Sequence, residues 1–213
     1  MAVSATVDRR ERIIDCNPAA LSGGVRPGMP VQAARAVLDG LCLVERKPAA
    51  ERQALERLAA WCYQYSSQVC IPADRTGLLL EAGASRRLFG APEQLARRLQ
   101  GELGRLGYHA QTGSAPTSEA AWLAARESRH IPAHAQPRQE LGALPLERLH
   151  LDGARIQAMQ RMGFRQLRDL FRLPRRALTR RFGPDLPDYL DRLLGITPDP
   201  RTFYQPPERF SSH

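Results

Sequence analysis

The chain has 213 residues, of which 43% are hydrophobic, so it is long enough to bury one sizeable core or two to three smaller ones. Its formal net charge is +9, and only Lys47 among its 31 lysine and arginine residues is lysine; such a basic chain attracts nucleic acid, although a GC-rich genome would also explain the arginine excess. No apolar run approaches the ~18 residues of a membrane span and no apolar signal region begins the chain, so we expect a cytoplasmic protein without membrane contact.

Strands and helices are expected to alternate along the first 126 residues. The β-branched or apolar segments that predict strands are 2–6, 12–16, 41–45, 78–82 and 108–115, the first two forming a hairpin. The segments with helical spacing, begun by proline or a capping residue, are 18–22, 31–38, 49–65, 92–106 and 118–126. Trp61 and Tyr63 lie off the apolar stripe of their helix, where they either pack half-buried or form a stacking surface for a base. This order predicts helices on one face of a mixed or antiparallel sheet.

The last third of the chain has a different residue pattern from the first 126 residues. Residues 128–138 form a loop that contains Pro132 and Pro137, which predicts a domain boundary. Residues 141–195 read as short helices separated by glycine and proline, which indicates a small all-helical unit. The final residues, 198–213, are polar and rich in proline, as in a linker.

The cysteine and histidine spacings predict no metal site. The four cysteines have no CxxC spacing and are best explained as reduced thiols: Cys16, Cys42, Cys62 and Cys70. His130 and His134 have the spacing of a helical metal pair, but Pro132 lies between them and opposes a helix. We therefore expect neither a metal nor a cofactor.

Five motifs in order resemble those of the Y-family lesion-bypass DNA polymerases. The sequence Gly-Val-Arg-Pro-Gly-Met-Pro resembles the fingers signature, and Glu-Ala-Gly-Ala-Ser-Arg-Arg-Leu-Phe-Gly resembles a palm strand with its turn. Ala-Pro-Thr precedes a palm-like helix, and a thumb-like helix-hairpin-helix region and the start of a little-finger domain follow. The five motifs occupy residues 24–30, 81–90, 115–117, 162–183 and 207–210. Each motif is weak alone, but their order and spacing are specific, and the resemblance covers nearly the whole chain.

The resemblance implies an α+β fold in which fingers-like and palm-like parts, a mixed sheet with helices, precede a small all-helical thumb with a degenerate helix-hairpin-helix. The parts that it implies are partial palm strands at 1–16, a fingers-like part at 17–68, a palm-like part at 69–130, a helical thumb-like part at 140–197 and the start of a linker at 198–213. The family's first palm strand would precede residue 1, and its little finger would follow residue 210.

The positions that align with the family's catalytic carboxylates hold other residues. Thr76 and Gly77 stand where the family has an Asp-Glu pair, and neither offers the carboxylate that Mg²⁺ prefers. Two-metal phosphoryl transfer depends on such ligands. The nearby carboxylates do not align with ligands, so we expect Asp74 to lie in a solvated turn and Glu81 to form an ion pair at the strand edge.

The positions that bind the incoming triphosphate in the family also hold other residues in this chain. Pro18 and Leu21 replace a tyrosine and an arginine of the fingers, and Ser118 and Trp122 replace two lysines of the palm helix. Leucine cannot hold phosphate as a guanidinium fork does. These joint losses resemble the non-catalytic ImuB-type branch of the family, so we expect no enzyme and no catalytic residue. That branch implies a scaffold in damage-induced translesion synthesis whose partners are DNA, a RecA-like protein, a sliding clamp and an error-prone polymerase.

DNA contact is predicted in the thumb-like part, where nine arginines lie between residues 150 and 182. The candidate residues are Arg155, Arg161, Arg165, Arg175, Arg176, Arg180 and Arg181. A helix-hairpin-helix binds phosphate through backbone amides, but His150 and Asp152 replace its hairpin glycines here. The arginine side chains would therefore supply the attraction, and we expect weak, sequence-independent binding. A stretch at 166–171 loosely resembles a clamp-binding peptide, but its helical spacing predicts burial.

Two alternatives stay open. An active error-prone lesion-bypass nucleotidyltransferase could use carboxylates outside the aligned positions, and primer extension would reveal it. A protein–protein adaptor that does not bind DNA is favoured by His150 and Asp152, because a carboxylate in the hairpin repels phosphate.

Overall fold

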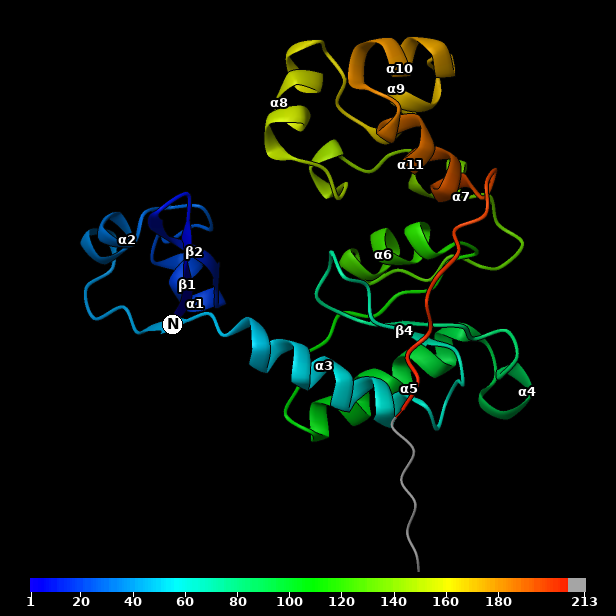
Figure 1. The fold of residues 1–213 in the computed structure, drawn as a ribbon, viewed down its shortest axis with the longest axis horizontal. Coiled ribbons are helices and arrows are strands. Elements are labelled where there is room, and N and C mark those ends of the chain that lie inside the picture. Colours follow the sequence, from blue (N-terminus) through cyan, green and yellow to red (C-terminus); the bar gives the residue numbers. More distant parts are fainter. Residues whose placement is uncertain (207–213) are drawn as a thin grey trace, which may run out of the picture. The chain divides into compact units, whose positions relative to one another are not determined.

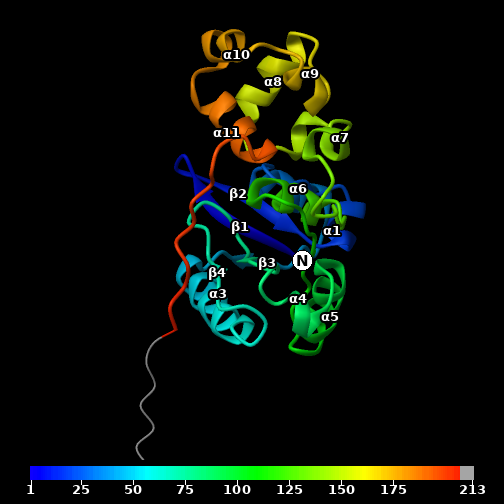
Figure 2. The ribbon, with the colours of Figure 1, turned by 90° about the vertical axis from the view of Figure 1, so that its right-hand side faces the viewer.

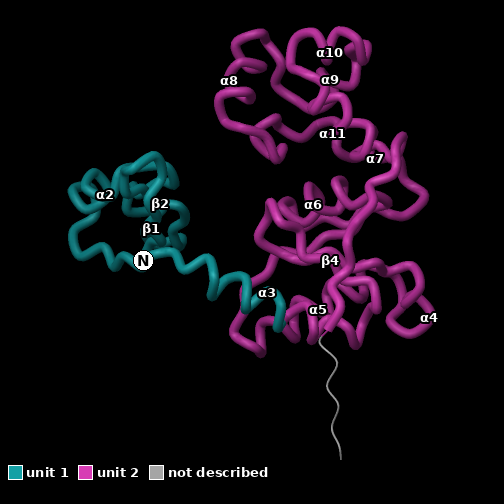
Figure 3. Tube along the Cα trace, in the orientation of Figure 1, with its two compact units in different colours: residues 1–57 teal, residues 58–213 magenta. Residues whose placement is uncertain are grey.

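The computed structural model describes residues 1–206 (Figure 1, and turned by 90° in Figure 2). The chain forms two compact units, residues 1–57 and the residues from 58 onward (Figure 3). The boundary between them lies within helix α3, Pro48–Cys62. The division of the chain into palm-like, fingers-like and thumb-like parts stays a prediction, and the motif predicted at 207–210 lies outside the described residues.

The first unit is built on a β-hairpin. Strands β1, Ala2–Val7, and β2, Arg10–Cys16, pair in antiparallel fashion, as predicted. The two residues between them, Asp8 and Arg9, have φ angles of +49° and +61°, which is the left-handed backbone of a tight hairpin turn. Strand β3, Leu43–Glu45, pairs in parallel with β1, so the strand order is β2-β1-β3.

Two short helices cover this sheet. Helix α1, Pro18–Ser22, begins where the Asn17 side chain accepts a hydrogen bond from the Ala20 amide at 3.0 Å, and helix α2 is Val31–Val37. Ile13 of β2 is buried together with Val25 and Ala34 in one core. The sheet and its helices therefore fold as one unit, because their apolar faces have one another to pack against.

The second unit begins with the end of α3 and a small sheet. Strands β4, Val69–Cys70, and β5, Leu79–Leu80, pair in antiparallel fashion. Trp61 and Tyr63 pack partly buried against the core of Ala59, Cys62 and Val69, which confirms half-buried packing for both rings. Helices α4, Arg86–Phe89, and α5, Pro92–Arg105, follow.

Three details of this region differ from the prediction. The strand expected at 78–82 has only two residues and is partly exposed. The Glu81 carboxylate accepts hydrogen bonds from the amides of Gly83 and Ala84, at 2.6 and 3.1 Å, and it forms no ion pair within residues 1–206, so the expected ion pair of Glu81 is wrong. Leu106, at the end of the apolar stripe of α5, is 53% exposed because the helix has already stopped at Arg105.

The strand expected at 108–115 is also absent from the described residues. This segment makes only a single parallel bridge, in which Ser114 accepts from the Ile131 amide at 2.7 Å. Gly113 lies directly against the backbone of helix α6, Ser118–Arg126, where a side chain would collide with Ala124 and Ala125. The helix α6 therefore packs closely on the side of this segment to which a side chain of residue 113 would point.

The remaining helices form the arginine-rich part of the second unit. They are α7, Pro137–Leu141; the 3-10 helix η1, Leu146–Arg148; α8, Gly153–Arg161; α9, Leu167–Phe171; α10, Arg175–Phe182; and α11, Asp185–Leu194. Leu167, Leu170 and Phe171 are buried, so the stretch that resembles a clamp-binding peptide is part of the core, as predicted.

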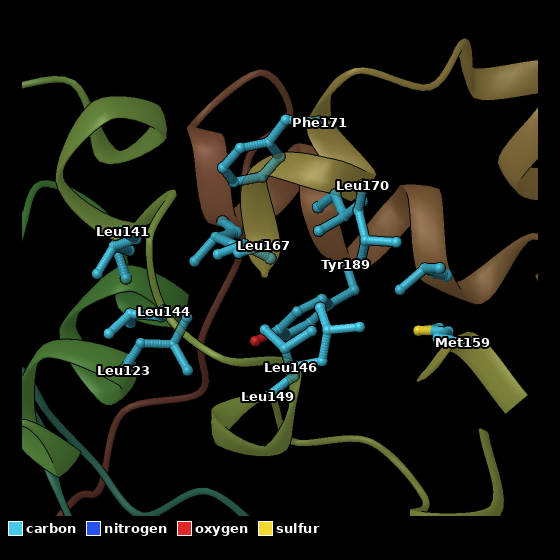
Figure 4. Close-up of a cluster of buried hydrophobic side chains, with 14 of the residues drawn as sticks. Leu123, Leu141, Leu144, Leu146, Leu149, Met159, Leu167, Leu170, Phe171 and Tyr189 are labelled. Atoms are coloured by element: carbon cyan, nitrogen blue, oxygen red, sulfur yellow. The ribbon is translucent and has the colours of Figure 1, made fainter. Parts of the chain in front are cut away.

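One core joins α6 to these helices across the predicted boundary. Leu123 of α6 lies in the same apolar cluster as Leu141, Leu146, Met159 and Tyr189 (Figure 4). The predicted loop ends at residue 136, because Pro137 begins α7, and it does not divide two packing units, because the cluster continues on both sides of it. The predicted α+β class, small sheets with many helices, is confirmed. Within residues 1–206, no helix has the length and apolar character of a membrane span.

Candidate functional site

The two positions aligned with metal ligands lie in a bend between β4 and β5, residues 73–77. Gly77 has a φ of +154°, and a Cβ atom there would lie 2.7 Å from Cη2 of Trp122. Trp122 is itself one of the positions aligned with the triphosphate-binding lysines. The indole therefore fills the space into which a side chain at residue 77 would project.

The bend also supplies an arginine to a buried carboxylate. Arg75 Nη2 lies 2.8 Å from Glu119 Oε2, and the guanidinium carbon lies 5.5 Å from the centre of the Trp122 ring. Both arginines donate their hydrogen bonds to Glu119 Oε1, Arg75 Nη2 at 3.0 Å and Arg201 Nη2 at 2.9 Å. Glu119 is only 3% exposed, so two guanidinium groups neutralise a carboxylate that water hardly reaches.

Asp74 lies exposed at the start of this bend, as predicted. Its carboxylate lies 3.2 Å from Arg75 Nε and 3.5 Å from His150 Nε2. Burial acts to raise the pKa of Asp74, but the charge of Arg75 and the local hydrogen bonds outweigh it and lower that pKa. Its negative charge is therefore already shared with an arginine of the same bend.

The other aligned triphosphate positions carry no positive charge. Ser118 is the first residue of α6, and the preceding Thr117 accepts a hydrogen bond from the Ala120 amide at 3.2 Å and donates one to the Leu193 carbonyl at 2.9 Å. In the first unit, Pro18 begins α1 and Leu21 is an exposed residue of that helix.

The hairpin predicted to contact phosphate precedes α8. The Asp152 carboxylate accepts a hydrogen bond from the Arg155 amide at 3.3 Å and so caps the N-terminus of this helix. A helix N-terminus attracts anions, and here an anion of the protein itself is already present. The hairpin therefore offers less attraction for a DNA phosphate than a glycine hairpin would.

Replacing Asp152 with asparagine is expected to raise affinity for duplex DNA about two- to fivefold at low salt, because it keeps the cap and removes one repelling charge. Fluorescence anisotropy with a labelled duplex at two salt concentrations measures the effect. Asp39→Asn is a matched control, since Asp39 lies in an exposed turn of the first unit. Equal affinities for the Asp152 variant and the unchanged chain would contradict the prediction.

Two of the seven candidate arginines are engaged in holding the fold. Arg155 Nη2 donates to the Phe182 carbonyl at 2.6 Å and so caps the end of α10. Arg175 forms ion pairs with Asp188 and Asp191 of α11. These contacts reduce the charge that either arginine can offer to DNA.

The other candidates are exposed arginines that form no ion pair within residues 1–206: Arg161, Arg165, Arg176, Arg180 and Arg181. Arg176 and Arg180 are four residues apart on α10 and therefore lie on the same side of that helix. Of the seven arginines that the sequence predicted for phosphate contact, five therefore remain candidates. Three of these five lie on α10.

The shared carboxylate of Glu119 was not found by sequence reasoning. Its partners, Arg75 and Arg201, lie 44 and 82 residues away in the chain. No local pattern connects such residues. The only available signal was the acidic residue early in a helix otherwise composed largely of alanine.

The arrangement of small sheets, covering helices and an arginine-rich helical part is the fold of Y-family DNA polymerases. DinB from Sulfolobus solfataricus superposes with a TM-score of 0.74 at 17% identity, over 94% of this chain and 61% of that one. A Y-family polymerase chimera, Dbh-Dpo4(243-245)-Dbh, gives 0.75 at 17% identity, over 96% and 62%. At such identities the likeness concerns the fold alone, and it confirms the predicted one.

Residues 1–126 match the IMS family, described as impB/mucB/samB, and the chain belongs to this family. Protein ImuB of Caulobacter vibrioides is 33% identical over 186 residues, which are 86% of this chain and 40% of that protein. DNA polymerase IV of Aeromonas hydrophila is 28% identical over 189 residues, 86% of this chain and 54% of that protein. The chain thus spans about half the length of these relatives or less.

Proposed function

We propose that this chain is a catalytically silent polymerase-like protein that binds DNA as a scaffold in damage-induced translesion synthesis. One observation carries the proposal. The residues at the aligned metal and triphosphate positions pack on one another, with the Trp122 ring in the space above Gly77.

The chemistry of the bend supports catalytic silence. A two-metal site needs carboxylates that are free to bind the ions. Thr76 and Gly77 have none, and the neighbouring carboxylates, Asp74 and Glu119, are paired with arginines. A divalent cation would have to displace a guanidinium group from either of them.

The exposed arginines support weak DNA binding. Each phosphate contact adds about −0.9 to the slope of log affinity against log salt concentration. Phosphate contacts carry no sequence information, so binding through Arg176, Arg180 and Arg181 would not depend on base sequence. The RecA-like protein, sliding clamp and error-prone polymerase implied by the resemblance remain proposed partners.

Changing Arg176, Arg180 and Arg181 together to alanine is expected to weaken duplex binding and to reduce the magnitude of the salt slope by up to about 2.7. Anisotropy titrations across a salt series measure both quantities. The matched control changes Arg86, Arg87 and Arg105, three exposed arginines on α4 and α5, and removes the same charge from the same unit. Equal losses in the two triple variants would mean that overall charge, and not α10, determines binding.

Primer extension with Mg²⁺ tests the other half of the proposal, and we expect no incorporation above background. Robust incorporation would overturn catalytic silence in favour of an active nucleotidyltransferase. The cap formed by Asp152 favours a second candidate, a protein–protein adaptor. A complete lack of duplex binding at low salt would support that candidate and contradict the scaffold.

A further inference from the structure

The segment after α11 runs back along the second unit without forming a helix or a strand. We call residues 198–206 the strap; Figure 1 shows it in orange-red, passing α6 and β4. Contacts at two points hold the strap, one at β4 and one at the buried carboxylate of α6. Neither point involves the arginine surface of α10, so the strap is independent of the proposed DNA contact.

The first point is a backbone contact with the edge of β4. The Tyr204 amide donates a hydrogen bond to the Val69 carbonyl at 2.6 Å, and the Tyr204 carbonyl accepts one from the Tyr63 hydroxyl at 3.2 Å. The Tyr204 side chain packs against the core that includes Cys62 and Val69. The strap thus satisfies a strand edge that the small sheet leaves open.

The second point is Glu119. Arg201 Nη2 lies 2.9 Å from Glu119 Oε1, and Arg201 Nε donates to Asp199 Oδ2 at 3.1 Å. Arg75 of the bend donates a hydrogen bond to the same oxygen of Glu119 at 3.0 Å. The side chains of Arg75 and Arg201 are only 10% and 18% exposed, so all three charges lie largely out of water.

Because these three charged groups are buried, the stability of each charge depends on its partners. Removing one partner of a buried ion pair leaves an uncompensated charge, which is strongly destabilising. Burial acts to lower the pKa of Arg201, but hydrogen bonds with Asp199 and Glu119 and their charges outweigh burial and raise that pKa. The guanidinium therefore stays charged, and its position follows that of Glu119.

We propose that Glu119 is the anchor that fixes the strap and couples it to the bend at 73–77. Arg201 and Arg75 share one carboxylate. The bend that carries Arg75 and the aligned metal positions therefore sets the path of the strap after α11. The strap is thereby held through Arg201 on a carboxylate that Arg75 also binds. Glu119 acts here as a positioning residue for the strap.

Hydrogen exchange of the Tyr204 amide, followed in the whole chain without DNA, tests the anchor. Arg201→Met is expected to speed this exchange about tenfold or more, because the strap loses its buried charge pair while its apolar stem is kept. Chymotrypsin cleavage at Phe203, which is exposed, should accelerate in parallel. Thr202→Ala is the control, since Thr202 is an exposed residue of the same strap.

Glu119→Gln should speed the exchange as well, but it also leaves Arg75 unpaired. Arg201→Met keeps the ion pair between Arg75 and Glu119. This variant therefore tests the anchor by itself if Glu119→Gln fails to fold. Unchanged exchange in a folded Arg201→Met variant would overturn the anchor, and so would an equal rise in the Thr202 control. Failure of the DNA-binding experiment would leave this result untouched.

Discussion

Placing carboxylates at the two positions aligned with the family's Asp-Glu pair, by changing Thr76 to aspartate and Gly77 to glutamate, is expected to destabilise the chain without producing primer extension. A Cβ atom at residue 77 would lie 2.7 Å from the Trp122 ring, and the φ of +154° is one that side chains rarely adopt. Even Gly77→Ala should lower the free energy of unfolding by about 2–4 kcal/mol, from overpacking and backbone strain together. Urea unfolding monitored by circular dichroism measures the loss.

Two further variants separate the two causes. Gly107 has a φ of +84° with no atom within 4 Å of an added Cβ, so Gly107→Ala should cost only the backbone strain, about 1 kcal/mol. In a Trp122→Ala background, Gly77→Ala should cost a similarly small amount, because the colliding ring is gone. If Gly77→Ala is tolerated as well as Gly107→Ala in the unchanged chain, then Trp122 can move aside and does not block the position.

Leu123→Ala is expected to lower the free energy of unfolding by about 2–5 kcal/mol, the range for a large-to-small change in a core. Leu123 is 2% exposed and lies in the cluster that joins α6 to the arginine-rich helices (Figure 4). Because this core is continuous, we expect hydrogen exchange to rise in α6 and in α7 to α11 together. Urea unfolding and segment-resolved exchange measure the two effects.

Leu88→Ala is the control for this change. Leu88 lies on α4 and is 81% exposed, so its loss should alter stability by less than about 0.5 kcal/mol. A rise in exchange confined to α6 in the Leu123 variant would contradict a shared core. It would show instead that the helical part folds independently, as the loop at 128–138 had suggested.

A shared core has a consequence for the proposed scaffold. The arginines of α10 are presented by helices that are packed onto α6, and α6 carries Trp122 and Glu119. Any DNA bound at α10 would therefore be held at a set position relative to the bend at 73–77. Such positioning is what the proposed scaffold requires of a protein that organises DNA and leaves synthesis to another enzyme.

The sequence by itself determined the local elements and the kind of fold. Pro18 and Pro92 mark helix starts, Thr117 caps α6, and the charged turn between two β-branched segments makes a hairpin. These signals act over a few residues, because capping, fixed proline φ angles and turn preferences depend only on neighbouring backbone groups. The ordered motifs likewise identified the family, since they required residue types and spacing but no knowledge of contacts.

Only the tertiary structure decided which distant residues meet. The contact of Gly77 with Trp122 and the sharing of Glu119 between Arg75 and Arg201 join segments far apart in the chain. The same holds for the arginines of the helical part, some of which pair within the fold while others face solvent. Burial and charge pairing depend on long-range packing, which the periodicity of a single segment does not contain.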